Sequence, residues 1–130
     1  MLDGLEPGTV LDVTGTVEEW ERLTEIIVSD SGDITITAMT STPTADVVSG
    51  TPDDWEVWEG CLITTDEVTV TGSVDETGAI PLSNGASIDD MFMEVSLDEG
   101  TTLLSITGVV HQRGDRYRIE PRSPSDILLP

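Results

Sequence analysis

Residues 11–17 read Leu-Asp-Val-Thr-Gly-Thr-Val, an alternation of apolar or small residues with polar ones. Successive side chains of a β-strand point to opposite faces, so this period of two predicts a strand with one dry face and one wet face. After a tip at residues 21–23, Thr24, Ile26 and Val28 continue the same period. Residues 8–28 are therefore predicted to form a hairpin, with Leu11, Val13, Gly15 and Val17 on the buried face.

The same pattern returns near the C-terminus at an offset of 93 residues. Residues 104–110 read Leu-Ser-Ile-Thr-Gly-Val-Val, and Thr107-Gly108 repeats Thr14-Gly15. Ile119 then matches Ile26, and Asp126-Ile127 matches Asp33-Ile34 at the same offset. Two copies are too few for a solenoid. We interpret them as two related β units that share one closing hairpin.

The remaining sequence also indicates strands, since no window holds a sustained helical stripe. Residues 40–54 are polar and rich in turn residues, which predicts a connection. From Trp55 onward a complete unit can be read, in which the inward parity changes across residues 64–67 and predicts a bend. Asn84-Gly85 predicts a hairpin turn between residues 79–82 and 86–88. Strands at 102–111 and 116–120 complete five.

The fold class predicted is therefore all-β, an OB-like five-stranded Greek-key barrel with an additional N-terminal β-hairpin. A chain of 130 residues fits one domain. We expect residues 1–54 to form the hairpin and connection that pack on the barrel, and residues 55–130 to form the barrel. The single cysteine, Cys61, lies in an apolar strand pattern and is expected to be an inert core thiol.

Charge narrows the range of partners. The chain holds 26 Asp and Glu against five Arg, for a formal net charge of −21. Such a surface repels phosphate backbones, so nucleic acid is a disfavoured partner. The apolar runs are too short to span a bilayer, and any export signal is expected to lie outside this sequence. The acidity fits either a salt-adapted or an exported protein.

Three segments carry a family resemblance. Residues 8–26, which contain Gly-Thr-Val-Leu-Asp-Val-Thr-Gly-Thr-Val-Glu-Glu-Trp, resemble a segment of the OB-like modules attached to bacterial and archaeal extracellular nucleases. Residues 55–63 look like the entry strand of those modules, and residues 119–127 like their exit. The segments cover about a third of the chain. The resemblance also allows the N-terminal copy to be the closing hairpin of a preceding barrel.

What the resemblance implies is an accessory role, because in that family the chemistry lies in a separate catalytic domain whose motifs are not present here. We expect a non-catalytic structural or recognition module of a larger exported or cell-surface protein, located outside the cell or in the cell envelope. Its partners would be other domains of the same polypeptide or another protein. The alternative is an OB domain that binds single-stranded nucleic acid directly.

Catalytic and metal sites find little support in the sequence. The only histidine, His111, falls in the polar phase of its strand and is expected to be solvated. One His and one Cys cannot form a zinc cluster, and the paired carboxylates of so acidic a chain carry little information. Residues 30–33 and Asp89-Asp90 are expected to be turn residues rather than calcium ligands. No catalytic residue, metal site or cofactor is predicted.

The one candidate ligand site is a cluster of cations. Four of the five arginines fall between residues 113 and 122 beside the only tyrosine, and they could receive an anion in an otherwise negative field. The candidate residues are Arg113, Arg116, Tyr117, Arg118 and Arg122. The competing interpretation is that these arginines pair with carboxylates on neighbouring strands. Arg113-Gly114-Asp115 spells an adhesion tripeptide, but a tight turn explains it better.

Overall fold

The computed structural model describes residues 5–130 and consists of strands joined by loops and three short 3-10 turns, which confirms the all-β class. The chain divides into two compact units, Met1–Thr44 and Ala45–Pro130. The boundary falls inside the predicted connection at 40–54. The packing of residues 1–54 on residues 55–130 stays a prediction.

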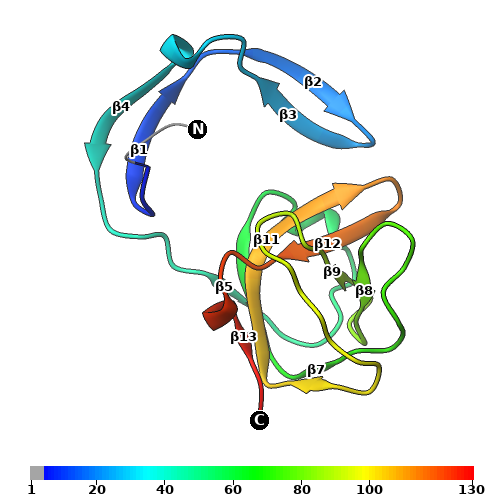
Figure 1. Ribbon diagram of the computed structural model, residues 1–130. Coiled ribbons are helices and arrows are strands. Elements are labelled where there is room, and N and C mark those ends of the chain that lie inside the picture. The colour runs from blue at the N-terminus through cyan, green and yellow to red at the C-terminus, as the bar shows by residue number, and fades with distance from the viewer. Residues whose placement is uncertain (1–4) are drawn as a thin grey trace. The chain divides into compact units, whose positions relative to one another are not determined.

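The first unit is a two-stranded ribbon (Figure 1). Strand β1 (Thr9–Val13) pairs with β4 (Ile34–Met39), and β2 (Thr16–Trp20) pairs with β3 (Leu23–Ile27). The 3-10 turn η1 (Ser31–Asp33) precedes β4, and the Asp30 carboxylate caps it by accepting from the amide of Gly32. The predicted single hairpin over residues 8–28 is wrong in its first half, because residues 9–13 pair with β4, a strand that the sequence analysis did not predict.

The predicted burial of the alternating face is also wrong for this unit. Every residue of β2 is exposed, Val17 included, and Val13 of β1 is exposed as well. A ribbon of two strands has no second layer to cover its apolar face, so alternation within the strands alone buries little. The period of two correctly predicted the strands but not what lies against them.

The second unit contains the other nine strands described. They are β5 (Asp46–Val48), β6 (Leu62–Thr65), β7 (Val68–Thr69), β8 (Ile80–Pro81), β9 (Ser87–Ile88), β10 (Thr102–Leu103), β11 (Ser105–Arg113), β12 (Arg116–Glu120) and β13 (Ile127–Leu128). Turns η2 (Glu56–Trp58) and η3 (Pro124–Asp126) complete it. β5 lies in the segment predicted to be connection and pairs in parallel with β6.

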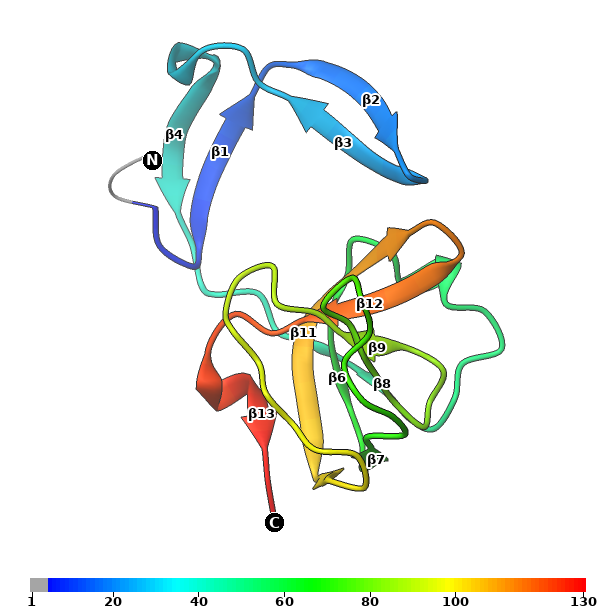
Figure 2. The ribbon, with the colours of Figure 1, turned by 45° about the vertical axis from the view of Figure 1, so that its right-hand side comes forward.

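The strands of the second unit follow the order β5-β6-β11-β12-β9-β8, and β13 joins β11 (Figure 2). β7 pairs with β10, and Val70 forms a bridge to Leu82. The predicted change of parity is confirmed, since Ile63 and Thr65 are buried before the bend at residues 66–67 and Val68 and Val70 are buried after it. The predicted turn at Asn84-Gly85 is also confirmed, with Gly85 at φ +86°.

The core of the second unit lies on one face of β11 and β12. Ile106, Val110 and Ile119 are fully buried there, and they belong to one cluster with residues from β6 to β10. Cys61 packs against this cluster and is only partly buried, so it lies at the edge of the core. Trp55 is buried in the same cluster, and the indole N–H of Trp55 donates to the carbonyl of Asn84 at 3.2 Å.

The sequence repeat is a structural repeat with the same strand register. In the ribbon Val13 pairs with Ile34, and in the second unit the equivalent Ile106 pairs with Ile127. In the same way, Thr16 pairs with Ile27, and its equivalent Val109 pairs with Glu120. The repeated glycines explain why the register is so well kept. A Cβ on Gly15 would lie 2.5 Å from the Ile26 side chain, and a Cβ on Gly108 would lie 2.8 Å from the Ile119 side chain. Both positions need glycine because the opposite strand approaches closely.

Candidate functional site

The face of β11 and β12 opposite the core carries a group of buried charged side chains. His111 comes from β11, Arg118 and Glu120 from β12, and Asp89 from the segment that follows β9. His111 is paired across the strands with Arg118. Because side chains alternate between faces, these residues leave the sheet on the side away from Val110 and Ile119.

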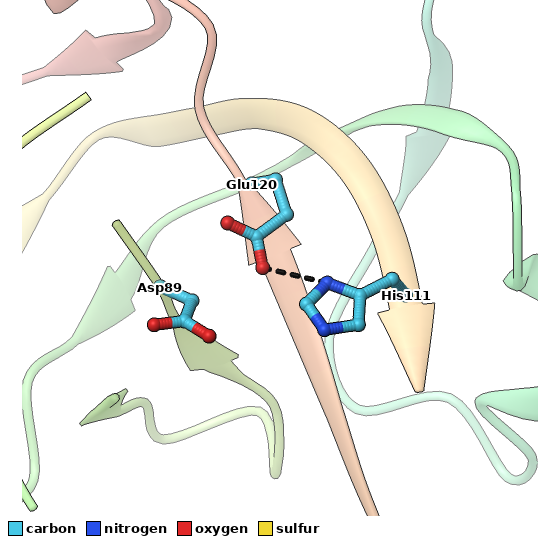
Figure 3. A group of neighbouring side chains, drawn as sticks. All are labelled: Asp89, His111 and Glu120. Atoms are coloured by element: carbon cyan, nitrogen blue, oxygen red, sulfur yellow. Dashed lines mark ion pairs between the residues drawn. The ribbon is translucent and has the colours of Figure 1, made fainter. Parts of the chain in front are cut away.

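The contacts within this group are short and specific. Figure 3 shows the His111 ring beside Glu120, where Nδ1 lies 2.6 Å from Oε1. The other oxygen of Glu120 accepts from the backbone amide of Met91 at 3.2 Å. The Arg118 guanidinium forms an ion pair with Asp89 and donates to Oγ1 of Thr77 at 2.8 Å. The result is a polar cluster built from a histidine and an arginine paired across the strands and two carboxylates.

The expectation that His111 is solvated is wrong, since this residue is only 6% exposed. The reason is that the segments around Thr77 and Met91 contact this face of the sheet and exclude water from it. Strand periodicity separates two faces but does not say which of them is wet. Asp89 and Glu120 were missed for the same reason. A signal was available, because the turn at Gly114-Asp115 fixes the register and sets His111 opposite Arg118.

Donor atoms of Asp89, His111 and Glu120 lie within 4.8 Å of one another, which is the spacing of metal ligands. Arg118 argues against a resident cation, because its guanidinium already neutralises Asp89 inside the same group. A divalent ion would have to share a buried space with a permanent positive charge. The donor set therefore fits a charge-paired structural cluster better than a metal centre.

The arginines of the predicted ligand site have separate partners in the structure. Arg116 is exposed and forms an ion pair with Asp75 at 3.2 Å, whereas Arg118 is buried in the cluster just described. Arg122 makes hydrogen bonds of 3.0 and 2.8 Å from Nε and Nη2 to the two oxygens of Asp126. Arg113 ends β11 at the turn, directly opposite Arg116. Arg116, Arg118 and Arg122 therefore each point at a carboxylate of their own unit.

Tyr117, the fifth candidate residue, donates its hydroxyl hydrogen bond to Glu56 of η2. This bond, together with desolvation and the negative charges of Asp54 and Glu59, raises the pKa of Tyr117 to about 12. The Arg122 hydrogen bonds lower the pKa of Asp126. The Thr77 hydroxyl likewise lowers the pKa of Asp75, the partner of Arg116. The Tyr117 shift comes from a contact between β12 and η2, whereas the Asp126 and Asp75 shifts come from contacts within one segment of chain.

An open depression of about 340 Å³ lies on the second unit between β5 and η2. Apolar side chains of Val47, Val57 and Trp58 line it together with the carboxylates of Asp53 and Asp54. The candidate arginines are not among its lining residues. Its walls offer an apolar contact and negative charge, a combination that does not suit a phosphate ligand.

Among residues 5–130 there is no helix with the length and apolarity needed to cross a membrane. Comparisons with models of protein families, with curated proteins and with solved structures gave no match.

Proposed function

We propose that the chain is a non-catalytic structural or recognition module of a larger exported or cell-surface protein and that it works through contacts with other polypeptide. The observation that carries this proposal is the apolar surface of the ribbon. Large apolar side chains lie exposed along both of its strand pairs, namely Val10, Val13, Val17, Trp20, Ile26, Ile27, Ile36 and Met39. Exposed apolar surface of this extent is typical of a protein interaction site.

The second unit is proposed to be an OB-like Greek-key barrel. Three features support this: a strand that bends between β6 and β7, a closing hairpin of β11 and β12, and a bridge from Val70 to Leu82 that links β7 to the segment after β8. Small OB-like barrels often serve as recognition modules. The proposal for the fold therefore agrees with the proposal for the function.

The alternative function, binding of single-stranded nucleic acid, needs a basic groove with exposed aromatic side chains. Arg116, Arg118 and Arg122 are each engaged by a carboxylate, which weakens the electrostatic attraction of this region for phosphate. The net charge of −21 acts in the same direction.

Two measurements test the proposed function. Fluorescence anisotropy with labelled single-stranded DNA, duplex DNA and a glycan set, at low and moderate salt, is expected to show no saturable binding. Saturable DNA binding that weakens with salt would replace the proposal by the nucleic-acid alternative. An apolar dye such as bis-ANS is expected to fluoresce on the wild type and much less on the Val17→Ser/Ile26→Ser variant. Equal fluorescence of the two proteins would contradict the proposed interaction surface.

A further inference from the structure

We infer that the ribbon is one half of a second barrel-like unit, and that its missing half is a β-strand segment built like residues 45–96 and joined to the N-terminal side of the ribbon. This inference rests on the proposed function and names the partner of the apolar surface. The occupant can be specified because the second unit shows what covers the same hairpin. Three independent comparisons between the two copies support it, the first two at the repeat offset of 93 residues and the third, at the turn before the hairpin, at an offset of 92.

The first comparison concerns burial. Val17 is 66% exposed whereas its counterpart Val110 is 0% exposed, and Ile26 is 54% exposed whereas Ile119 is 0% exposed. Val13 and Ile106 show the same contrast, at 42% and 0%. The side chains are the same or nearly the same in the two copies, so the difference lies in what covers them. In the second unit the cover comes from residues of β6 to β9, such as Ile63, Val70 and Ile88.

The second comparison concerns strand edges. In the second unit β6 pairs with residues 107–109, β7 pairs with β10, and β9 pairs with Arg118 and Ile119. The equivalent ribbon positions are residues 14–16, Thr9-Val10 and Glu25-Ile26, and no strand of residues 5–44 pairs with these edges. Within residues 5–44 the ribbon is only two strands wide at these positions, so its outer edges lack the third strand that β6, β7 or β9 supplies in the second unit.

The third comparison concerns the entrance to the hairpin. The ribbon begins Leu5-Glu6-Pro7-Gly8-Thr9, and the second hairpin is entered through Leu97-Asp98-Glu99-Gly100-Thr101. Both segments form a turn in which the threonine amide donates three residues back, to Glu6 in one and to Asp98 in the other. Gly8 and Gly100 both have positive φ, +96° and +86°. The second hairpin is entered from the segment that covers it, so the covering segment of the ribbon is expected to enter the same way.

A second copy of this chain fits the ribbon less well. The only segment of that copy with the right strands, residues 45–96, is already paired with its own β11 and β12. The ribbon of another molecule would have to displace a hairpin that is covalently attached and fully buried on its apolar face. Dimerisation through the ribbon is therefore an outcome that would overturn the inference.

The experiment supplies the missing half by fusion. Residues 45–96 are placed directly before Leu5 of the chain, so that the added segment reaches the ribbon through the same turn that follows residue 96. Hydrogen exchange by mass spectrometry is measured on residues 9–39 of the fused and the original chain. Exchange in this range is expected to slow by at least about 10-fold on fusion, because the ribbon gains strand partners and a covered face. Peptides from β11 serve as the internal reference for correct folding.

A matched pair of variants makes the result specific. Val17→Asp/Ile26→Asp changes the face that would be covered, and it is expected to abolish the protection in the fused chain while leaving exchange of β11 unchanged. Glu18→Ser/Glu25→Ser changes the directly adjacent cross-strand pair on the opposite face, and it is expected to keep the protection. Loss of protection in both variants would contradict the assigned face.

Two other results would overturn the inference. The first is equal exchange of residues 9–39 in the fused and original chains while β11 remains protected. The second is a concentration-dependent dimer of the original chain, seen by sedimentation velocity, with a protected ribbon. Either result leaves the proposed function intact as long as DNA does not bind, whereas DNA binding would remove that function even if the fused ribbon were protected.

Discussion

Arg118 shows how a single buried residue shapes this module. Its guanidinium is 3% exposed and neutralises Asp89, which is 7% exposed. A buried charge without its partner costs far more than the pair contributes, because the remaining ion cannot be hydrated. The effect of this contact on the free energy of unfolding is therefore largest when only one of the two partners is removed.

We predict that Arg118→Met destabilises the second unit by about 3–5 kcal/mol, since Asp89 is left buried and unpaired. The double variant Asp89→Asn/Arg118→Met is expected to recover a large part of that loss. Urea denaturation followed by tryptophan fluorescence, to which the buried Trp55 contributes, measures both. A double variant that is less stable than Arg118→Met alone would show that the pair is not the main function of these side chains.

Tyr117 gives a second prediction, because the chain has one tyrosine and its ionisation can be followed alone at 295 nm. Its pKa is raised to about 12, mainly by the hydrogen bond to Glu56. Glu56→Gln is expected to move the midpoint of this titration down toward the ordinary value near 10. An unchanged midpoint in that variant would exclude Glu56 as the cause.

The sign of the accompanying stability change follows from the direction of the shift. The folded state holds the Tyr117 proton more tightly than the unfolded state does, so this contribution is complete below the unfolded pKa near 10. It is lost as the pH rises from about 10 through 12. Glu56→Gln should flatten the fall in stability over that range.

At the scale of elements, the repeat provides matched positions for one substitution. Ile119→Ala removes a fully buried side chain and is expected to cost about 2–5 kcal/mol. Ile26→Ala changes the equivalent side chain on the exposed ribbon and is expected to stay within about 0.5 kcal/mol. Calorimetry or urea denaturation compares the two. Equal losses would mean that the Ile26 side chain is covered in solution.

Elements were predicted well where local chemistry decides them. The period of two found β2, β3, β11 and β12, and Asn84-Gly85 located the β8–β9 turn, because these signals depend on neighbours in sequence. Strand β4 was missed although Ile34–Met39 alternates, because the hairpin had been closed within residues 8–28, and β5 was missed because it is three residues long and lies in a turn-rich segment. The candidate site was largely unpredictable, since the burial of His111 depends on segments around Thr77 and Met91 that meet it only in the folded chain.

At the scale of the whole molecule, charge dominates. A net charge of −21 on 130 residues produces self-repulsion that opposes compaction. Lowering the Debye length from about 30 Å at 0.01 M salt to about 8 Å at physiological ionic strength screens most of it. We predict a higher urea midpoint in 0.5 M NaCl than in 0.02 M NaCl with an unchanged m-value. A comparison in sucrose of equal osmolality controls for non-ionic effects, and a midpoint that does not respond to salt would contradict the prediction.

The uncovered edges of the ribbon have a consequence for the colloidal behaviour of the protein. An unpaired strand edge can pair with the edge of another chain. Charged side chains on or beside such strands commonly oppose this association. Glu18, Glu19 and Glu25 are placed for that role on β2 and β3. The triple variant Glu18→Gln/Glu19→Gln/Glu25→Gln, which removes these charges, should therefore favour edge-to-edge assembly of the chain into fibrils.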